Sequence, residues 1–142
     1  MALPDSPETT VRDLYDGVWN AADPSVADDL VAADYTIHDR EIADELAGPD
    51  LYRALAEGTR AAFPDAEFAV EDVVVGSDEV AVRWTMTGTH EGEGLGVEPT
   101  GATVTIEGID VNRFADGLLV ETWTQTDELG MLQQVGAVPE DE

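Results

Sequence analysis

The chain has 142 residues, no cysteine, and 32 acidic against 6 basic residues, which gives a formal net charge of −26 at pH 7. The absence of cysteine excludes disulfides, thiolate nucleophiles and cysteine-ligated metal sites, and the negative charge disfavours binding to DNA, RNA or anionic lipid. With 43% hydrophobic residues the chain is not a disordered polypeptide, and its length fits a single domain over residues 1–142.

The acidic residues are spread along the chain instead of being gathered in a tail. At molar salt the Debye length is only about 3 Å, so repulsion between them is largely screened. We therefore interpret the composition as a solubility adaptation of a salt-accumulating halophile; the alternative is an acidic mimic of nucleic acid or a cation buffer. No signal-peptide pattern and no apolar run of roughly 18–20 residues is found, so we expect a soluble cytoplasmic protein.

Three helices are predicted in the first half of the chain. The first begins after Ser6, its candidate N-cap, and places apolar residues at helical spacing as far as Trp19. A second, shorter helix is predicted over residues 23–35, and a brief extended segment over 35–39. A third helix is predicted over 48–65, where a Gly-Pro pair opens it and a second proline closes it.

After the third helix the apolar period changes to two, which is typical of strands. Strands are predicted over residues 66–76, 80–90, 103–114 and 118–126. The glycine-rich loop between the second and third of them is interpreted as a flap over a pocket, and Asp127 is the expected N-cap of a short final helix. Helices followed by hairpin-connected strands indicate an α+β fold, in which helices cover one face of a strongly curved antiparallel sheet and leave an internal cavity.

Five motifs occur in order between residues 63 and 136. They are Phe63-Pro64-Asp65, Gly88-Thr89-His90, Pro99-Thr100-Gly101, Arg113-Phe114 with Asp116-Gly117, and the segment from Asp127 to Gly136. As a set they resemble the SnoaL-like polyketide cyclase family of the NTF2-like superfamily. The resemblance implies an NTF2-like cone with a deep apolar pocket, usually in a homodimer, and chemistry that needs no cofactor.

In the characterised cyclases of that family, an aspartate on the last strand removes a proton between carbonyls for an aldol closure, and histidines help hold the enolate. This chain has Thr122 and Thr124 where the family has its last-strand histidine and aspartate. On the preceding strand, the positions that face the pocket are Gly108 and Asp110. Either the base has moved to Asp110, or the chemistry is different or absent.

Asp110 and His38 are the candidate catalytic residues. Asp110 shares a strand face with Val104 and Ile106, where a carboxylate is costly to bury unless it is hydrogen-bonded or paired. It is therefore a candidate base or substrate anchor, and the alternative is a structural carboxylate. His38 is a candidate partner of Asp110 or of a substrate carbonyl, and the alternative is a surface histidine held by a neighbouring aspartate.

The predicted substrate-contacting residues are Thr122, Thr124, Trp84, Met86 and His90. Each has a structural alternative: the threonines as β-branched residues of a pleated face, the tryptophan and methionine as core or pocket wall, and the histidine as a brace for the loop. No metal site is predicted, because the two histidines lack a ligand spacing.

Two function hypotheses remain open. The first is an enzyme that acts without a cofactor on a small apolar carbonyl compound, by enolisation with cyclisation, isomerisation or hydrolysis. The second is a non-catalytic module of the same fold that sequesters or delivers an apolar metabolite; a structural dimerisation domain is a third. A homodimer is expected, because Trp123 lies on the outer face of its strand, opposite to Thr122 and Thr124.

Overall fold

The computed structural model describes residues 7–21, 23, 25–38, 46–92 and 98–136. Its sheet has the strand order β1-β5-β4-β3-β2. The strands are β1 (Val31–His38), β2 (Glu67–Val75), β3 (Glu79–Thr89), β4 (Thr103–Ala115) and β5 (Leu118–Thr126). The helical segments are α1 (Pro7–Leu14), the π-helical η1 (Tyr15–Asn20), α2 (Ser25–Leu30), α3 (Gly48–Ala62) and α4 (Glu128–Gln134).

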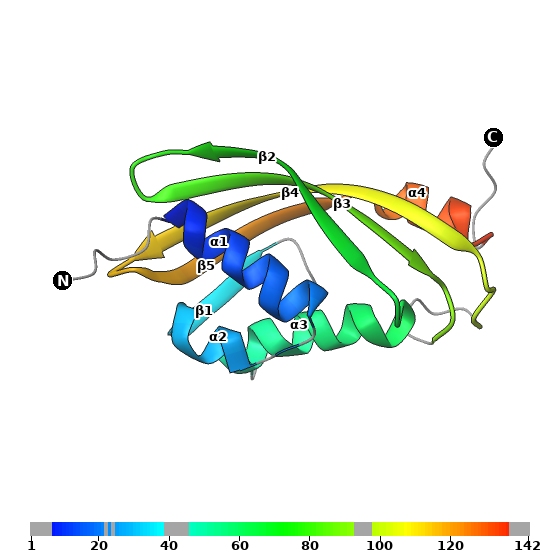
Figure 1. The fold of residues 1–142 in the computed structure, drawn as a ribbon, viewed down its shortest axis with the longest axis horizontal. Helices are drawn as coiled ribbons and strands as arrows, with labels where there is room; N and C mark the ends of the chain where they lie inside the picture. The colour runs from blue at the N-terminus through cyan, green and yellow to red at the C-terminus, as the bar shows by residue number, and fades with distance from the viewer. Residues whose placement is uncertain (1–6, 22, 24, 39–45, 93–97, 137–142) are drawn as a thin grey trace.

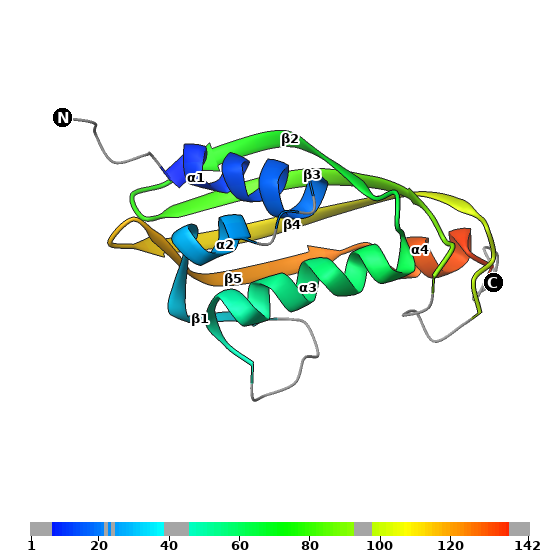
Figure 2. The same cartoon turned by 60° about the horizontal axis from the view of Figure 1, so that its bottom comes forward.

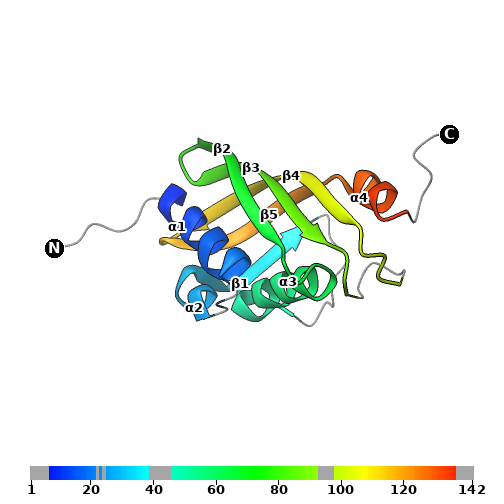
Figure 3. The same ribbon diagram turned by 45° about the vertical axis from the view of Figure 1, so that its right-hand side comes forward.

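The helices α1, α2 and α3 lie together on one face of the sheet (Figure 1, Figure 2). Viewed from the side, the sheet curves over them, and α4 lies at the end of the sheet where β3 ends and β4 begins (Figure 3). The inner face of the sheet and the apolar faces of the helices therefore enclose the interior. No helix of the described residues is long and apolar enough to cross a membrane.

The expected α+β architecture, with helices on one face of a curved sheet, is confirmed. The prediction of helix over residues 23–35 is wrong beyond Leu30, because β1 begins at Val31. This strand pairs parallel with β5, so the sheet is mixed instead of wholly antiparallel. Its pattern of two buried residues, two exposed residues and the buried Tyr35 suits a helix as well as a strand. Only the pairing with β5 decides between them.

The other predicted elements agree with the structure at their ends to within a few residues. The N-cap of α4 is confirmed, because the Asp127 carboxylate accepts a hydrogen bond from the backbone N–H of Gly130 at 2.9 Å. Two predictions, the N-cap at Ser6 and the flap formed by the glycine-rich loop, depend on residues outside the described part of the chain.

The turn between β4 and β5 sets the register of the two strands that carry the site. Asp116 and Gly117 both have positive φ angles, of 54° and 79°, as a two-residue type I′ hairpin turn requires. A bulge follows between Arg113 and Phe114, and beyond it Asp110 faces Thr124. The turn and the bulge together therefore decide which side chains of β4 and β5 meet on the inner face.

Two of the family-like motifs meet where α3 leads into β2. The Asp65 carboxylate accepts hydrogen bonds from the backbone N–H of Thr89 at 2.7 Å and from its hydroxyl at 2.8 Å. These bonds lower the pKa of Asp65, because they stabilise its charged form. The motifs around Phe63 and His90 thus join the end of α3 to the end of β3, and their role is structural.

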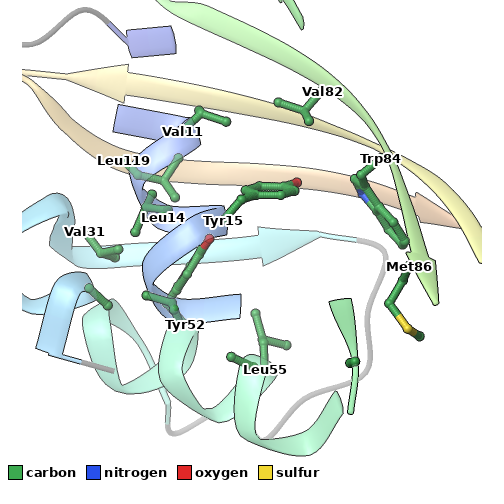
Figure 4. Packing of buried hydrophobic residues seen from close by; sticks show 14 of the residues in the cluster. Val11, Leu14, Tyr15, Val31, Tyr52, Leu55, Val82, Trp84, Met86 and Leu119 are labelled. Carbon is green, nitrogen blue, oxygen red and sulfur yellow. The ribbon is translucent and has the colours of Figure 1, made fainter. Parts of the chain in front are cut away.

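The hydrophobic core lies between the helical layer and the inner face of the sheet (Figure 4). The helices contribute Val11, Leu14 and Leu55, and the sheet contributes Val82 and Leu119, all buried. Trp84 and Met86 of β3 are buried on the same side, as their alternation with Val82 predicts. Near Trp84 and Met86 the core opens into a cavity.

Candidate functional site

A cavity of about 700 Å³ lies between the helices and the inner face of the sheet. Its wall is mostly apolar and aromatic, with polar side chains concentrated on β4 and β5. Its lining residues include Tyr15, Trp19, Tyr52, Trp84, Met86, Asp110, Asn112, Thr122, Thr124 and Thr126. An apolar pocket with a few convergent polar groups is the usual form of a small-molecule site.

The polar wall is ordered by the strand register. Along β4, the residues Gly108, Asp110 and Asn112 alternate toward the inside, and their partners on β5 are Thr126, Thr124 and Thr122 in that order. The three threonines of β5 therefore share one face, as their spacing predicts, and all three line the cavity.

Asp110 lies in this wall and accepts hydrogen bonds from both layers of the fold. The Tyr15 hydroxyl, from the first residue of η1, donates to Oδ2, and the Thr124 hydroxyl donates to Oδ1 at 2.6 Å. A π-helical segment is rare and occurs often at functional sites. Burial, and after it the negative charge of Asp110, raises the pKa of Tyr15 well above its usual range. Tyr15 is therefore a neutral hydrogen-bond donor at physiological pH.

Asn112 and Thr122 form the neighbouring pair toward the hairpin turn. The Thr122 hydroxyl donates to Asn112 Oδ1 at 2.9 Å, and Asn112 Nδ2 donates to the backbone oxygen of Val80 at 3.3 Å. Both side chains are buried. Because buried polar groups ordinarily have such partners, this pair braces the wall beside Asp110.

Aromatic side chains form the helical side of the cavity. Trp19 Nε1 donates to the Tyr52 hydroxyl at 2.8 Å, and the two rings meet edge to face with their centroids 5.9 Å apart. Burial is the main cause that raises the pKa of Tyr52 well above its usual range. The rings of Tyr15, Tyr52 and Trp84 lie in the space between the sheet and α3 (Figure 4).

Stability is expected to fall in alkali because of Tyr15 and Tyr52. Their folded-state pKa values are raised, whereas an unfolded tyrosine titrates near 10. Their contribution to stability is therefore complete below about pH 10 and is lost as the pH rises further, because the unfolded state releases its protons first. Urea unfolding monitored from pH 8 to 11 measures this decline. The double variant Tyr15→Phe, Tyr52→Phe should show a shallower decline, and an equal slope would contradict the assignment.

His38 lies on the other side of its strand from the cavity. Its neighbour Ile37 lines the cavity, whereas His38 Nε2 lies 2.6 Å from Glu121 Oε2 and its ring stacks on Trp123 with a centroid distance of 5.0 Å. Glu121 also accepts a hydrogen bond from Arg113 Nε at 2.8 Å, and the bonds from His38 and Arg113 lower the pKa of Glu121. The predicted pairing of His38 with Asp110 is therefore wrong, because strand alternation points the two side chains to opposite faces.

His90 is fully buried and is not part of the cavity wall. Its Nδ1 lies 3.1 Å from the Thr100 hydroxyl and 3.3 Å from the Thr100 backbone nitrogen, and its backbone pairs with Gly101 and Ala102. The structure therefore places His90 away from any substrate in the cavity and favours the alternative interpretation, a brace for the segment that leads into β4.

Trp84, Met86, Thr122 and Thr124 do line the cavity, as predicted. Sequence reasoning missed Tyr15 and Asn112. Tyr15 falls among the residues at apolar helical spacing in the first predicted helix, and nothing local distinguishes an aromatic core residue from one with a hydroxyl partner. Asn112 could have been found, because it follows Asp110 at the strand period of two. Among the described residues, no group of three or more His, Cys, Asp or Glu side chains could hold a metal ion.

Gly108 leaves room for the indole of Trp84. A Cβ placed on Gly108 would lie 2.2 Å from Trp84 Cζ2, so the variant Gly108→Ala must displace the ring and is expected to lose about 1–3 kcal/mol of stability. Gly58→Ala in α3 is the matched control, because its Cβ meets nothing within 4 Å, and it should be neutral or slightly stabilising. Urea unfolding of both variants checks this. An unchanged midpoint for Gly108→Ala would contradict the packing described.

The comparisons with known proteins agree with the fold. The model of the SnoaL-like polyketide cyclase family matches residues 9–135. IdmH from Streptomyces antibioticus, a proposed polyketide cyclase, is 33% identical, with a TM-score of 0.79 over 93% of this chain and 99% of that one. AclR from Streptomyces galilaeus, a proposed hydroxylase, is 31% identical, with a TM-score of 0.79 over 95% and 83%. TsrD from Streptomyces laurentii is 25% identical, with a TM-score of 0.82 over 94% and 100%. No curated protein matches the chain at a significant level.

Proposed function

Because the chain belongs to the SnoaL-like polyketide cyclase family, we propose that it enolises a small, largely apolar carbonyl compound in its cavity, without a cofactor, and that Asp110 is the base. The observation that carries the proposal is a carboxylate in the wall of an apolar cavity, oriented by hydroxyl groups from both layers of the fold. A positioned carboxylate in such a place is suited to general-base catalysis.

The environment of Asp110 acts on its basicity in two directions. Removal from water makes a carboxylate more basic, whereas hydrogen bonds to its charged form make it less basic. The Tyr15 hydroxyl occupies one acceptor position on Oδ2, and the Thr124 hydroxyl occupies one on Oδ1. A carboxylate has about four acceptor positions, so these two bonds do not by themselves prevent it from taking a proton. They hold its plane in one orientation toward the cavity.

The proposed step is a proton transfer. The bond between the α-carbon of the substrate and its proton breaks, and the proton moves to Asp110. The electron pair of that bond forms the carbon–carbon double bond of the enolate, and the carbonyl π pair moves to oxygen. The enolate carbon then attacks a second carbonyl group or takes a proton back at another position, which gives cyclisation or isomerisation.

The second candidate function is a binding module of the same fold without chemistry. The same hydrogen bonds favour it, because a partly buried structural carboxylate is also expected to have hydroxyl partners. The substitution of threonine for the family's last-strand histidine and aspartate, at Thr122 and Thr124, supports it as well. The two candidates differ in whether a bound ketone loses an α-proton.

The test is hydrogen–deuterium exchange of 2-tetralone, an apolar ketone with acidic C1 protons, followed by proton NMR. The proposal expects exchange in D₂O well above the buffer rate, rising with pH through a single ionisation. Carbon-detected NMR of the side-chain carboxyls, assigned with Asp110→Asn, should give the same pKa for Asp110. Binding of 2-tetralone without faster exchange would overturn the enzyme proposal in favour of the binding module.

The homodimer, the cytoplasmic location and the halophilic source stay predictions. The outer face of the sheet carries Ile109, which is 49% exposed, and the half-buried Trp123. Apolar side chains on that face support the proposal that a second copy of the chain packs there.

A further inference from the structure

The hydroxyl of Tyr52 has a proton that is not used within the described part of the protein. Its oxygen accepts a hydrogen bond from Trp19 Nε1 at 2.8 Å, but a tyrosine hydroxyl also has one proton to donate. Among the described residues, no acceptor of that proton is found. Tyr52 is 5% exposed and lines the cavity. Because buried polar hydrogens ordinarily have an acceptor, this proton points to a ligand that carries an acceptor atom.

Tyr52 and the proposed base belong to opposite layers of the fold. The side chain of Tyr52 extends from α3 toward the sheet (Figure 4), whereas Asp110 lies on β4, and both residues line the cavity. Their groups also interact through space. Burial first, then Tyr35 and the charge of Asp110, raise the pKa of Tyr52. The hydroxyl and the carboxylate therefore face one cavity from its two sides.

The surroundings of Tyr52 hold its hydroxyl in place. The ring meets Trp19 edge to face at a centroid distance of 5.9 Å and Tyr35 at 5.6 Å, so it is packed from two directions. The hydrogen bond from the Trp19 indole fixes the position of the oxygen. A hydroxyl that accepts one hydrogen bond is also polarised to donate a stronger one. Tyr52 is therefore a preorganised donor.

We propose that the Tyr52 hydroxyl donates a hydrogen bond to the carbonyl oxygen of the substrate. The catalytic part of this inference rests on the proposed function, but binding of the oxygen does not depend on turnover. As Asp110 takes the α-proton, the electron pair of the broken C–H bond forms the enolate double bond, the carbonyl π pair moves to oxygen, and negative charge grows there. A preorganised donor stabilises charge where it develops. Tyr52 thus acts on the carbonyl oxygen while Asp110 acts on the α-carbon.

The first experiment compares two probes that differ by one carbonyl group. Tetralin has the ring system of 2-tetralone without the oxygen. In Tyr52→Phe, binding of 2-tetralone should weaken by about 5–10-fold, the usual effect of one lost hydrogen bond, whereas binding of tetralin should change by less than about twofold. Calorimetry measures both affinities. Equal loss for the two probes would show a packing effect and overturn the proposal.

Trp19→Phe provides the background that isolates the Tyr52 proton. Removal of the Tyr52 oxygen leaves the Trp19 N–H without its acceptor, and that N–H would then compete for the ketone. Trp19→Phe alone removes the N–H and keeps the hydroxyl, so the preference for 2-tetralone over tetralin should remain. Adding Tyr52→Phe should then remove the preference. Tyr35→Phe, which alters another phenol of the cavity wall, should keep the preference, and its loss there would overturn the assignment to Tyr52.

The second experiment observes the carbonyl bond directly. The infrared C=O stretch of bound 2-tetralone, identified by difference against the ¹³C=O compound, should lie below its frequency in an apolar solvent, because a hydrogen bond weakens the C=O bond. In Tyr52→Phe with Trp19→Phe it should return toward the apolar value, whereas Trp19→Phe alone should leave it low. A frequency that is the same with and without the Tyr52 hydroxyl would contradict the proposal.

The outcomes separate this inference from the proposed function. Binding and a carbonyl frequency that depend on Tyr52, without exchange of 2-tetralone, would support the donor and refute the enzyme. Exchange that depends on Asp110, with an unchanged preference for 2-tetralone when the Tyr52 hydroxyl is removed, would refute the donor and leave the enzyme standing. Failure of 2-tetralone to bind up to its solubility would also overturn the proposed donor.

Discussion

Replacing Asp110 by asparagine is expected to lower kcat/KM for exchange of the 2-tetralone C1 protons by about 10²–10⁴-fold. The amide cannot take the proton, so only the background reaction and any effect of binding remain. The substitution keeps the size of the side chain, and the cavity should still bind 2-tetralone. A loss of exchange with retained binding therefore separates the role of the base from the shape of the cavity.

Substitution of Asp110 by asparagine also disturbs its hydrogen bonds, which affects the stability of the variant. An asparagine presents one oxygen and one N–H₂ group, so only one of the hydroxyls of Tyr15 and Thr124 keeps its acceptor. The hydroxyl that loses its acceptor costs about 1–3 kcal/mol of stability. Thermal unfolding of the variant should therefore be measured before its kinetics. Tyr15→Phe is the companion variant, because it leaves the carboxylate in place and removes one donor. It should move the pH profile of exchange to higher pH, since it removes a bond to the charged form.

Glu107→Gln is the matched control for Asp110→Asn. Glu107 lies on the same strand, but it is exposed on the outer face, and its substitution changes the net charge by the same amount. We expect exchange within about twofold of the wild type, as for surface positions away from a site. Exchange that survives in Asp110→Asn would mean that another group, or the solvent, removes the proton, and the assignment of the base would be wrong.

The melting temperature is expected to rise by at least roughly 6 °C between about 0.2 M and about 2 M KCl, the shift that some 2 kcal/mol produces in a domain of this size. The excess of 32 acidic over 6 basic residues destabilises the compact state through self-repulsion. The described arginines offset only a small part of this repulsion. Arg12, Arg53, Arg83 and Arg113 each pair with one or two carboxylates, and Arg60 bonds to backbone oxygens.

Calorimetry or circular dichroism over a KCl series measures this effect, and sucrose of equal osmolality is the control for general exclusion from the surface. Screening acts mainly below about 1 M, where the Debye length falls from about 10 to 3 Å. Most of the rise should therefore come before that concentration. A melting temperature that is flat across the series would contradict the interpretation of the acidic surface as an adaptation to salt.

The period of the apolar residues was sufficient to predict the α+β class, the four strands of the second half and the two longest helices, because each of these elements has one buried face. The same alternation identified Asp110, Thr122, Thr124, Trp84 and Met86 as inward-facing residues. The residue type of Asp127, a common N-cap, indicated that the final helix begins after it. These features depend on residues that are close together in the sequence, so the sequence of one chain is sufficient to predict them.

The partners of these residues were decided by the tertiary structure. Strand β1 became a strand through its parallel pairing with β5, and that pairing turned His38 away from the cavity and toward Glu121. Tyr15 became the donor to Asp110 because η1 packs over a strand that lies 95 positions further along the chain. The placement of the Trp84 indole over Gly108 depends on the register of β3 and β4. Contacts between residues distant in sequence are set by packing and register, which no local pattern encodes.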